Sequence, residues 1–316
     1  MRVKTMYFTT NIKQYQILII VIIILLELTS SFVPNLLNKN RFSSKSSSLN
    51  SIIRNLKQEV EGGEISYDYY ESGIGSNPAI LYLPCLNRPK NEAKASNLVA
   101  WCRRADYSFI CADYYGVGRS SGTFEDGTVG RWAKDTIVLI ESVVKKKVIL
   151  VGHGVGAWVS FIIASKRPDL VSGIVGLSAD PDFTEELLWK NLDDGVKEKI
   201  MSNGLHEITW GNTKYPISWK LIEDGRENLL LGGEADSYPV TCPVRLIHSI
   251  SDEEVNYSYA LKLVENIQSK DAVVTLLKDS NHGMEDDIDM KTMRNCIKDV
   301  LSAYKGDFDL TSPGSG

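Results

Sequence analysis

A glycine stands in this chain where a reactive serine would be expected. Residues 149–158 read Ile-Leu-Val-Gly-His-Gly-Val-Gly-Ala-Trp, and Gly152, Gly154 and Gly156 have the spacing of the Gly-x-Ser-x-Gly motif. In that motif a serine lies on a sharp turn between a strand and a helix, and its hydroxyl attacks an acyl carbonyl carbon. An apolar run on each side supplies the strand and the helix. The pattern predicts a site shaped for acyl transfer that lacks its nucleophile at Gly154.

Two further residues complete the pattern of a catalytic triad. In proteins with this motif, the acid and then the histidine follow the nucleophile along the chain. Asp252 comes shortly after an apolar run that ends at His248, and His282 follows the apolar run 272–277. Each is therefore expected in a loop at the carboxyl end of a strand. Together they predict a hydrogen bond between Asp252 and His282 that holds the imidazole in position.

From Glu59 onward, apolar runs alternate with helical patterns. Several runs are continuous, which is typical of parallel strands covered on both faces. Between them, apolar residues recur every three or four positions, as on one face of a helix. This alternation predicts a doubly wound, mostly parallel sheet of the α/β class. The predicted strands are 65–70, 79–83, 107–112, 148–151, 171–177, 244–248 and 272–277.

The stretch 182–237 interrupts the alternation. Its first half has the apolar spacing of a helix, and its second half is irregular and rich in aromatic residues around Trp210, Tyr215 and Trp219. Because the stretch stands between two predicted strands, we expect it to form a cap over the carboxyl ends of the sheet, where ligands bind in α/β folds.

These segments, together with Leu83-Pro84-Cys85-Leu86 and the run Asp113–Asp135, resemble the α/β-hydrolase superfamily from about residue 64 to the end of the chain. Within it, the chain is similar to the mitochondrial thioesterase and acyl-glucuronide esterase type, which removes acyl groups from protein cysteines. The resemblance implies an α/β-hydrolase fold with a helical cap. The chain departs from that type at two positions, since Gly154 replaces the nucleophilic serine and Cys85 stands where the family usually has glycine.

The resemblance also implies roles for backbone groups and raises alternatives for the function. The N–H groups of Leu86 and Val155 would form an oxyanion hole, which a change of serine to glycine leaves intact. Losing a triad serine costs about 10⁶ in kcat, and the non-catalytic N-myc downstream-regulated group also lacks this serine. One interpretation is a non-catalytic or strongly impaired hydrolase that binds a small acyl-type ligand or a protein partner. The alternatives are an active ester or thioester hydrolase in which His282 and Asp252 activate a water, and a serine enzyme of which Gly154 is a variant.

The sequence gives less specific predictions for the other cysteines and histidines. The thiol of Cys85 is one hypothesis for a replacement nucleophile beside His282, and a structural role next to the oxyanion hole is the alternative. His153 is expected to pack rather than react, while His248 and His206 are expected to be bystanders. The five cysteines are scattered, and no His/Cys cluster has metal-ligand spacing, so the sequence predicts neither a metal nor an organic cofactor.

The first 58 residues have the composition of a leader. Basic residues precede an apolar run, Ile17–Leu26, about half as long as a membrane-spanning helix, which predicts a signal peptide over 1–31. Residues 32–58 are basic, serine-rich and free of acidic residues, as in a transit peptide, and this leaves 59–316 as the hydrolase domain. Such two-part leaders resemble those of proteins sent to plastids, so we expect a plastid location. The secretory pathway and the mitochondrion are the alternatives.

Charge and cysteine content limit the partners. The chain has a formal net charge of −5, but residues 59–316 hold 27 basic and 39 acidic residues, about −12. Such an acidic domain has no electrostatic basis for binding nucleic acid or an anionic membrane. We expect no stable membrane span in the mature chain. The odd number of scattered cysteines favours a reducing compartment.

Overall fold

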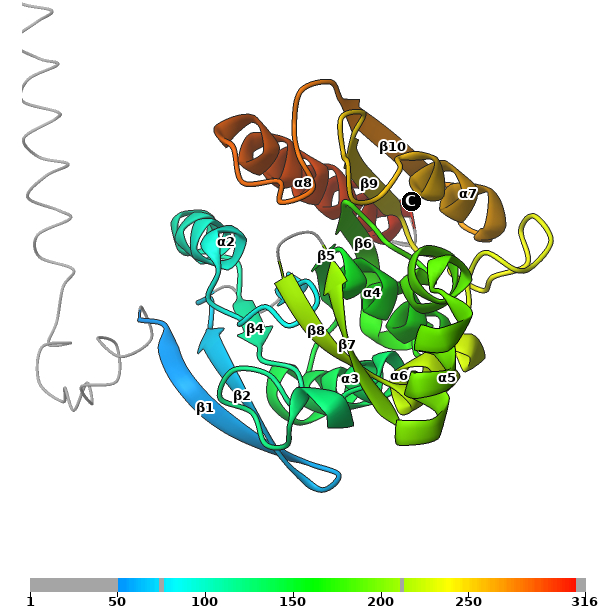
Figure 1. Cartoon of the computed structure of the whole chain (residues 1–316). Coiled ribbons are helices and arrows are strands. Elements are labelled where there is room, and N and C mark those ends of the chain that lie inside the picture. Colours follow the sequence, from blue (N-terminus) through cyan, green and yellow to red (C-terminus); the bar gives the residue numbers. More distant parts are fainter. Residues whose placement is uncertain (1–50, 74–76, 211–212, 311–316) are drawn as a thin grey trace, which may run out of the picture. The chain divides into compact units, whose positions relative to one another are not determined.

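The computed structural model describes residues 51–73, 77–210 and 213–310, and these form a sheet flanked by helices (Figure 1). The strands of the main sheet are β1 (Ile53–Val60), β2 (Gly63–Tyr70), β3 (Ala79–Leu83), β4 (Phe109–Ala112), β5 (Val148–His153), β6 (Val171–Leu177), β9 (Val244–Ser249) and β10 (Ala272–Leu277). The α-helices are α2 (Ala93–Ala105), α3 (Val129–Leu139), α4 (Val155–Lys166), α5 (Asp194–Asn203), α6 (Trp219–Glu227), α7 (Ser258–Asn266) and α8 (Asp287–Leu310).

The main sheet has eight strands in the order β1-β2-β4-β3-β5-β6-β9-β10. β2 pairs antiparallel with β1 and β4, whereas all the other neighbouring strands pair in parallel. All seven strands predicted from the sequence are present, with ends that differ slightly. The prediction of a doubly wound α/β sheet is therefore confirmed.

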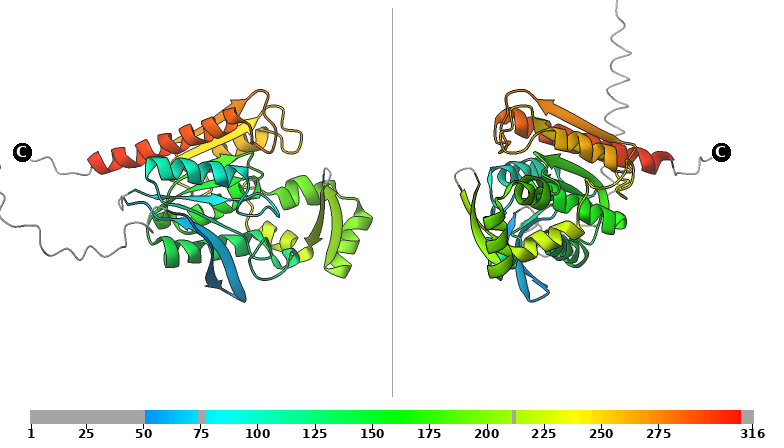
Figure 2. Two further views of the ribbon diagram at one scale, coloured as in Figure 1. Left: turned by 90° about the vertical axis from the view of Figure 1, so that its left-hand side faces the viewer. Right: turned by 45° about the vertical axis from the view of Figure 1, so that its right-hand side comes forward.

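Helices cover both faces of this sheet (Figure 2). α2 and α8 pack on one face, and α3, α4 and α7 pack on the other. Alternate side chains of β3 show the division, because Leu81 lies in the cluster with α3 and α4 while Tyr82 lies in the cluster with α2 and α8. Burial on both faces explains why the parallel strands read as continuous apolar runs.

The helix that follows Gly154 is buried on every side. All residues of α4 from Val155 to Ala164 are buried, as expected for a helix that is apolar all round. Its Trp158 also contacts the insertion that follows β6. The indole Nε1–H donates to the Asn228 carbonyl at 3.0 Å, and the ring meets Phe183 edge-on at 5.7 Å. The turn at Gly154 therefore rests on one of the most rigidly packed elements of the fold.

The insertion between β6 and β9 begins with helical turns at Thr184–Leu188 and Trp189–Asn191 and continues with α5. It then forms an antiparallel hairpin of β7 (Leu205–Trp210) and β8 (Thr213–Ser218), followed by α6. The helical first part is confirmed, whereas the prediction of an irregular aromatic stretch is wrong, because that stretch forms a hairpin. Figure 2 shows the insertion at the end of the domain opposite the C-terminal end of α8.

The boundary predicted at Glu59 is too late. β1 begins at Ile53 and pairs with β2, so residues 53–58 belong to the sheet and not to a leader. Residues 1–50 of the predicted leader, including the apolar run Ile17–Leu26, lie outside the described residues. Within the described residues, no helix has the length and apolar character that crossing a membrane requires.

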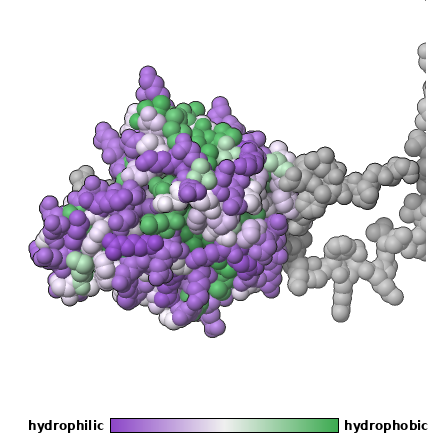
Figure 3. All heavy atoms as spheres, turned by 90° about the vertical axis from the view of Figure 1, so that its right-hand side faces the viewer, coloured by the Kyte–Doolittle hydropathy of each residue, from purple (hydrophilic) through white to green (hydrophobic). Residues whose placement is uncertain are grey.

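The surface near the edge of the sheet is partly apolar. Figure 3 shows a mostly hydrophilic face with apolar side chains gathered over its upper part. Exposed apolar residues on the edge strand β10 and on α7 are Val273, Leu276 and Leu261. Because β10 has a neighbour on only one side, it is the least covered of the parallel strands.

Candidate active site

The candidate residues lie in loops that follow neighbouring parallel strands. Cys85 follows β3, Gly154 follows β5, Asp180 follows β6, Asp252 follows β9 and His282 follows β10. Since the carboxyl ends of parallel strands share one edge of the sheet, these loops converge. The structure therefore brings together the residues that the sequence analysis singled out, and it adds Asp180.

The turn at Gly154 has the backbone conformation that the motif predicts. Gly154 has φ 55° and ψ −120°, a region that costs a residue with a side chain about 1–3 kcal/mol. The flanking glycines are needed for close approach. A Cβ on Gly152 would overlap the backbone of Gly156, and a Cβ on Gly156 would overlap the carbonyl of Leu83. The predicted strand, turn and helix are thus all present.

The side chain of Cys85 fills the space that a side chain at position 154 would need. A Cβ added to Gly154 would lie 2.5 Å from Cys85 Sγ and 3.4 Å from Asp180 Oδ2. Non-bonded heavy atoms settle at about 3.5–4 Å, so a serine at 154 and Cys85 in its present position exclude each other. Gly154 and Cys85, the two residues that depart from the family pattern, therefore lie on either side of the same space.

The predicted pair of Asp252 and His282 is formed. His282 Nδ1 donates to Asp252 Oδ2 at 3.0 Å, and the Asp252 side chain is fully buried. Burial alone would raise the pKa of Asp252, but hydrogen bonds with His248 and His282 outweigh it and hold that pKa well below its ordinary value. His248 Nε2 lies 3.3 Å from Asp252 Oδ2, so the expectation that His248 is a bystander was wrong.

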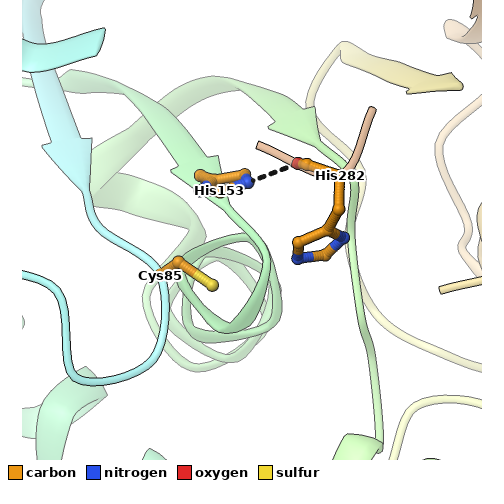
Figure 4. A group of neighbouring side chains, drawn as sticks. All are labelled: Cys85, His153 and His282. Carbon is orange, nitrogen blue, oxygen red and sulfur yellow. Dashed lines mark hydrogen bonds between the residues drawn. The ribbon is translucent and has the colours of Figure 1, made fainter. Parts of the chain in front are cut away.

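The imidazole of His282 is poised as a cation. Burial disfavours its charge, but hydrogen bonds with Asp252 and Cys85 outweigh burial and raise the pKa of His282 to about 11. Figure 4 shows Cys85, His153 and His282 facing a common centre, with Cys85 Sγ and one nitrogen of each ring within 4.8 Å of one another. At neutral pH the His282 ring is therefore protonated on both nitrogens, and its charge lies next to the Asp252 carboxylate.

His153 packs as expected, and it also fixes the main chain at His282. Its Nε2 lies 2.9 Å from the His282 carbonyl oxygen. Burial holds the pKa of His153 well below its ordinary value, so the ring is neutral and its Nε2–H donates to that carbonyl. Nδ1 then carries a lone pair and has no partner among the described residues. One thiol and two imidazoles are donors that zinc sites use. The sequence could not show this grouping, because two loops and the end of β5 supply its members.

Asp180 is a site residue that the sequence analysis missed. It is buried beside Gly154, and in the part of the chain that the structure describes its Oδ1 has no hydrogen-bond partner. Burial raises the pKa of Asp180 to about 8, so the carboxyl is protonated at neutral pH. A signal was available, because an acidic residue three positions beyond a predicted strand stands at the same edge as Asp252 and His282.

Replacing Asp180 with asparagine is expected to remove a pH dependence of stability. The folded-state pKa of about 8 exceeds the ordinary value of 3.8, so the folded protein binds the extra proton between these values. The wild type should lose about 1.4 kcal/mol of unfolding free energy per pH unit as the pH rises through that range. Urea denaturation at pH 5, 6 and 7 measures the difference between the two proteins. Equal pH slopes would contradict a protonated Asp180, and Asp193→Asn at an exposed position is the control.

A cleft of about 340 Å³ opens onto part of this site. Its wall includes Cys85, Leu86 and His282, together with Tyr215 from the β7–β8 hairpin. Leu86 directly follows Cys85, and Val155 is the first residue of α4, where N–H groups have no partner within the helix. His206 lies on β7 and does not line this cleft.

Comparisons with known proteins agree with this geometry. A family model described as alpha/beta hydrolase fold matches residues 78–199. The mitochondrial palmitoyl-protein thioesterase ABHD10 of Bos taurus is 30% identical over 235 residues, which cover 73% of this chain and 76% of that protein. The human protein of the same name is 27% identical over the same length and the same shares of the two chains.

Solved structures give the same result. The crystal structure of a putative hydrolase from Agrobacterium vitis S4 matches with a TM-score of 0.72 and 27% identity, covering 79% of this chain and 98% of its own. ABHD10 from mouse matches with a TM-score of 0.70 and 26% identity, covering 80% of this chain and 99% of its own. The chain therefore belongs to the α/β-hydrolase superfamily, as an ABHD10-like member of thioesterase or esterase type.

Proposed function

We propose that this protein binds a small acyl ester or acyl thioester in the cleft and that the serine mechanism of its family does not operate in it. The observation that carries the proposal is the position of Cys85 Sγ, 2.5 Å from where a Cβ on Gly154 would lie. No hydroxyl is present at 154, and a side chain there would require Cys85 Sγ to move. In this proposal Asp252 orients His282, and the N–H groups of Leu86 and Val155 receive the acyl oxygen.

The relatives and the cleft support the ligand class. The relatives are named palmitoyl-protein thioesterases, and their substrate class is a thioester. The cleft volume of about 340 Å³ is near the lower end of the range for small-molecule sites, which favours a short acyl group. The same relatives are named as mitochondrial, which favours the mitochondrial alternative for this chain over the plastid. Imaging of a C-terminal fluorescent fusion distinguishes these locations.

A second function, hydrolysis by a water that His282 and Asp252 activate, is favoured by their intact hydrogen bond. A general base must first be neutral, however, and the pKa of His282 is raised to about 11. Hydrolysis by this route should therefore increase steadily with pH across the neutral range. The contact between Cys85 and the space at 154 argues against a serine variant at this single position.

The variant Gly154→Ser is expected to gain less than tenfold in ester hydrolysis and to lose about 2–4 kcal/mol of unfolding free energy. The loss combines backbone strain at positive φ with the contact to Cys85. Gly204→Ser is a matched control, because Gly204 has φ +74° and no heavy atom within 4 Å of an added Cβ. Its variant should show the strain without the contact.

The proposed function itself is tested on the full-length wild type. A ketone analogue of a butyryl thioester, in which a methylene replaces the thioester sulfur, should raise the Tm in proportion to the logarithm of its concentration. A fluorophosphonate probe, which labels activated serines, should leave the protein unlabelled. Absence of ligand-induced stabilisation would refute acyl binding, and a labelled serine would refute loss of the serine mechanism.

A further inference from the structure

Cys85 differs from the other four cysteines in its surroundings. Burial raises the pKa of the thiols of Cys102, Cys111, Cys242 and Cys296, which is typical of unreactive structural cysteines. Cys85 is half-buried, lines the cleft and has its Sγ within 4.8 Å of a ring nitrogen of His282. Reactive cysteines occupy partly exposed sites next to a histidine, and Cys85 lies in such a site.

The sulfur also stands in the right place for the reaction. A serine at 154 would carry its Oγ on a Cβ only 2.5 Å from the present position of Cys85 Sγ. Cys85 Sγ therefore occupies the region that the family's nucleophile would use, although it comes from the loop after β3. Asp252 orients His282 through a hydrogen bond of 3.0 Å between His282 Nδ1 and Asp252 Oδ2.

We propose that the thiol of Cys85 is the acyl-accepting nucleophile of this site, with His282 as its proton partner and Asp252 as the residue that orients His282. The nucleophile has moved from the turn after β5 to the loop after β3, and Gly154 leaves the room that its sulfur needs. This inference rests on the proposed function, because it requires an acyl thioester or ester in the cleft.

The chemistry balances with water as the only other reactant. The Cys85 thiolate attacks the carbonyl carbon, and the oxygen charge that develops faces the N–H groups of Leu86 and Val155. The bond to the leaving sulfur or oxygen breaks as His282 gives that atom its proton, which leaves an S-acyl Cys85 and a neutral imidazole. Water then attacks the acyl carbon while His282 takes its proton. The acid leaves, and the thiolate and imidazolium are restored.

The test uses the full-length protein with S-butyryl-N-acetylcysteamine as substrate. Cys85→Ala should lower kcat by about 10³-fold or more, because the acylation step loses its nucleophile. Cys242→Ala, at a half-buried cysteine away from the cleft, should stay within twofold of the wild type. Mass spectrometry of acid-quenched wild type should find a butyryl group on the peptide that contains Cys85.

A second readout needs no substrate. Iodoacetamide at pH 6.5 should alkylate Cys85 before the other cysteines, and His282→Ala should slow that alkylation at least tenfold.

Three results would overturn the inference: wild-type turnover by Cys85→Ala, an acyl group on another residue, or activity that a chelator removes and zinc restores through Cys85, His153 and His282. If the ketone analogue stabilises the wild type but no turnover occurs, the nucleophilic role of Cys85 is refuted and the proposed binding function is kept. If the analogue does not stabilise the wild type, the proposed binding function is itself refuted.

Discussion

The double variant Cys85→Gly/Gly154→Ser is expected to hydrolyse short acyl esters about 10³-fold or more faster than Cys85→Gly alone. Removing the Cys85 side chain clears the space that lies 2.5 Å from a Cβ at position 154, and the serine then reaches His282 from the family's usual turn. The rest of the machinery is unchanged, because Asp252 still holds His282 at 3.0 Å. Loss of a triad serine costs about 10⁶ in kcat, so a partial return of 10³ leaves room for imperfect geometry.

The design requires all four proteins, the wild type, both single variants and the double variant. Residues in contact give non-additive effects, and the cycle measures how strongly positions 85 and 154 depend on each other. We expect Gly154→Ser to gain little, Cys85→Gly to be inactive, and the double variant to react with a fluorophosphonate probe at the serine introduced in place of Gly154. If Gly154→Ser alone matched the double variant, the Cys85 side chain would not exclude a serine, and the proposed reason for the loss of the serine mechanism would be wrong.

Much of this site was predictable because its residues keep a fixed relation to strands. Gly154, Asp252 and His282 each follow a continuous apolar run, and such runs become parallel strands whose carboxyl ends meet. The order along the chain and the glycine spacing then indicate the roles. The same reasoning places the oxyanion-hole candidates Leu86 and Val155, one after β3 and one at the start of α4.

What the sequence could not show depends on distances between side chains from different loops. The overlap between Cys85 and the space at 154 arises from residues 69 positions apart, and no local pattern records it. His248 was taken for a bystander because its contact with Asp252 depends on the turn after β9. The β7–β8 hairpin was missed because residues 205–209 and 214–216 are exposed or half-buried, so the hairpin has no strong apolar face. β1 was missed because a basic edge strand has the composition of a leader.

Asp252→Asn is expected to lower kcat for the butyryl thioester by about 10⁴, the effect of the corresponding change in a serine triad. The carboxylate accepts from His282 Nδ1 and from the N–H groups of Glu254 and Val255, so an amide in its place reverses one hydrogen bond and removes the charge. Loss of that charge should also lower the pKa of His282 from about 11. A protonated His282 is needed to give the leaving group its proton.

The pH profile separates this role from a merely structural one. In the wild type, His282 keeps its proton until the pH nears 11, so kcat should stay level through pH 7–9, whereas in Asp252→Asn the fall should begin at least one pH unit lower. The contribution of His282 to the free energy of unfolding should change with pH in the same direction as kcat. A folded-state pKa above 6.5 contributes stability that is full below 6.5 and is lost as the pH rises towards 11, so the stability difference between the wild type and Asp252→Asn should be larger at pH 6 than at pH 9. Asp279→Asn, exposed in the loop that carries His282, is the control for both measurements. An unchanged profile in Asp252→Asn, together with a loss of activity in Asp180→Asn, would transfer the orienting role to Asp180.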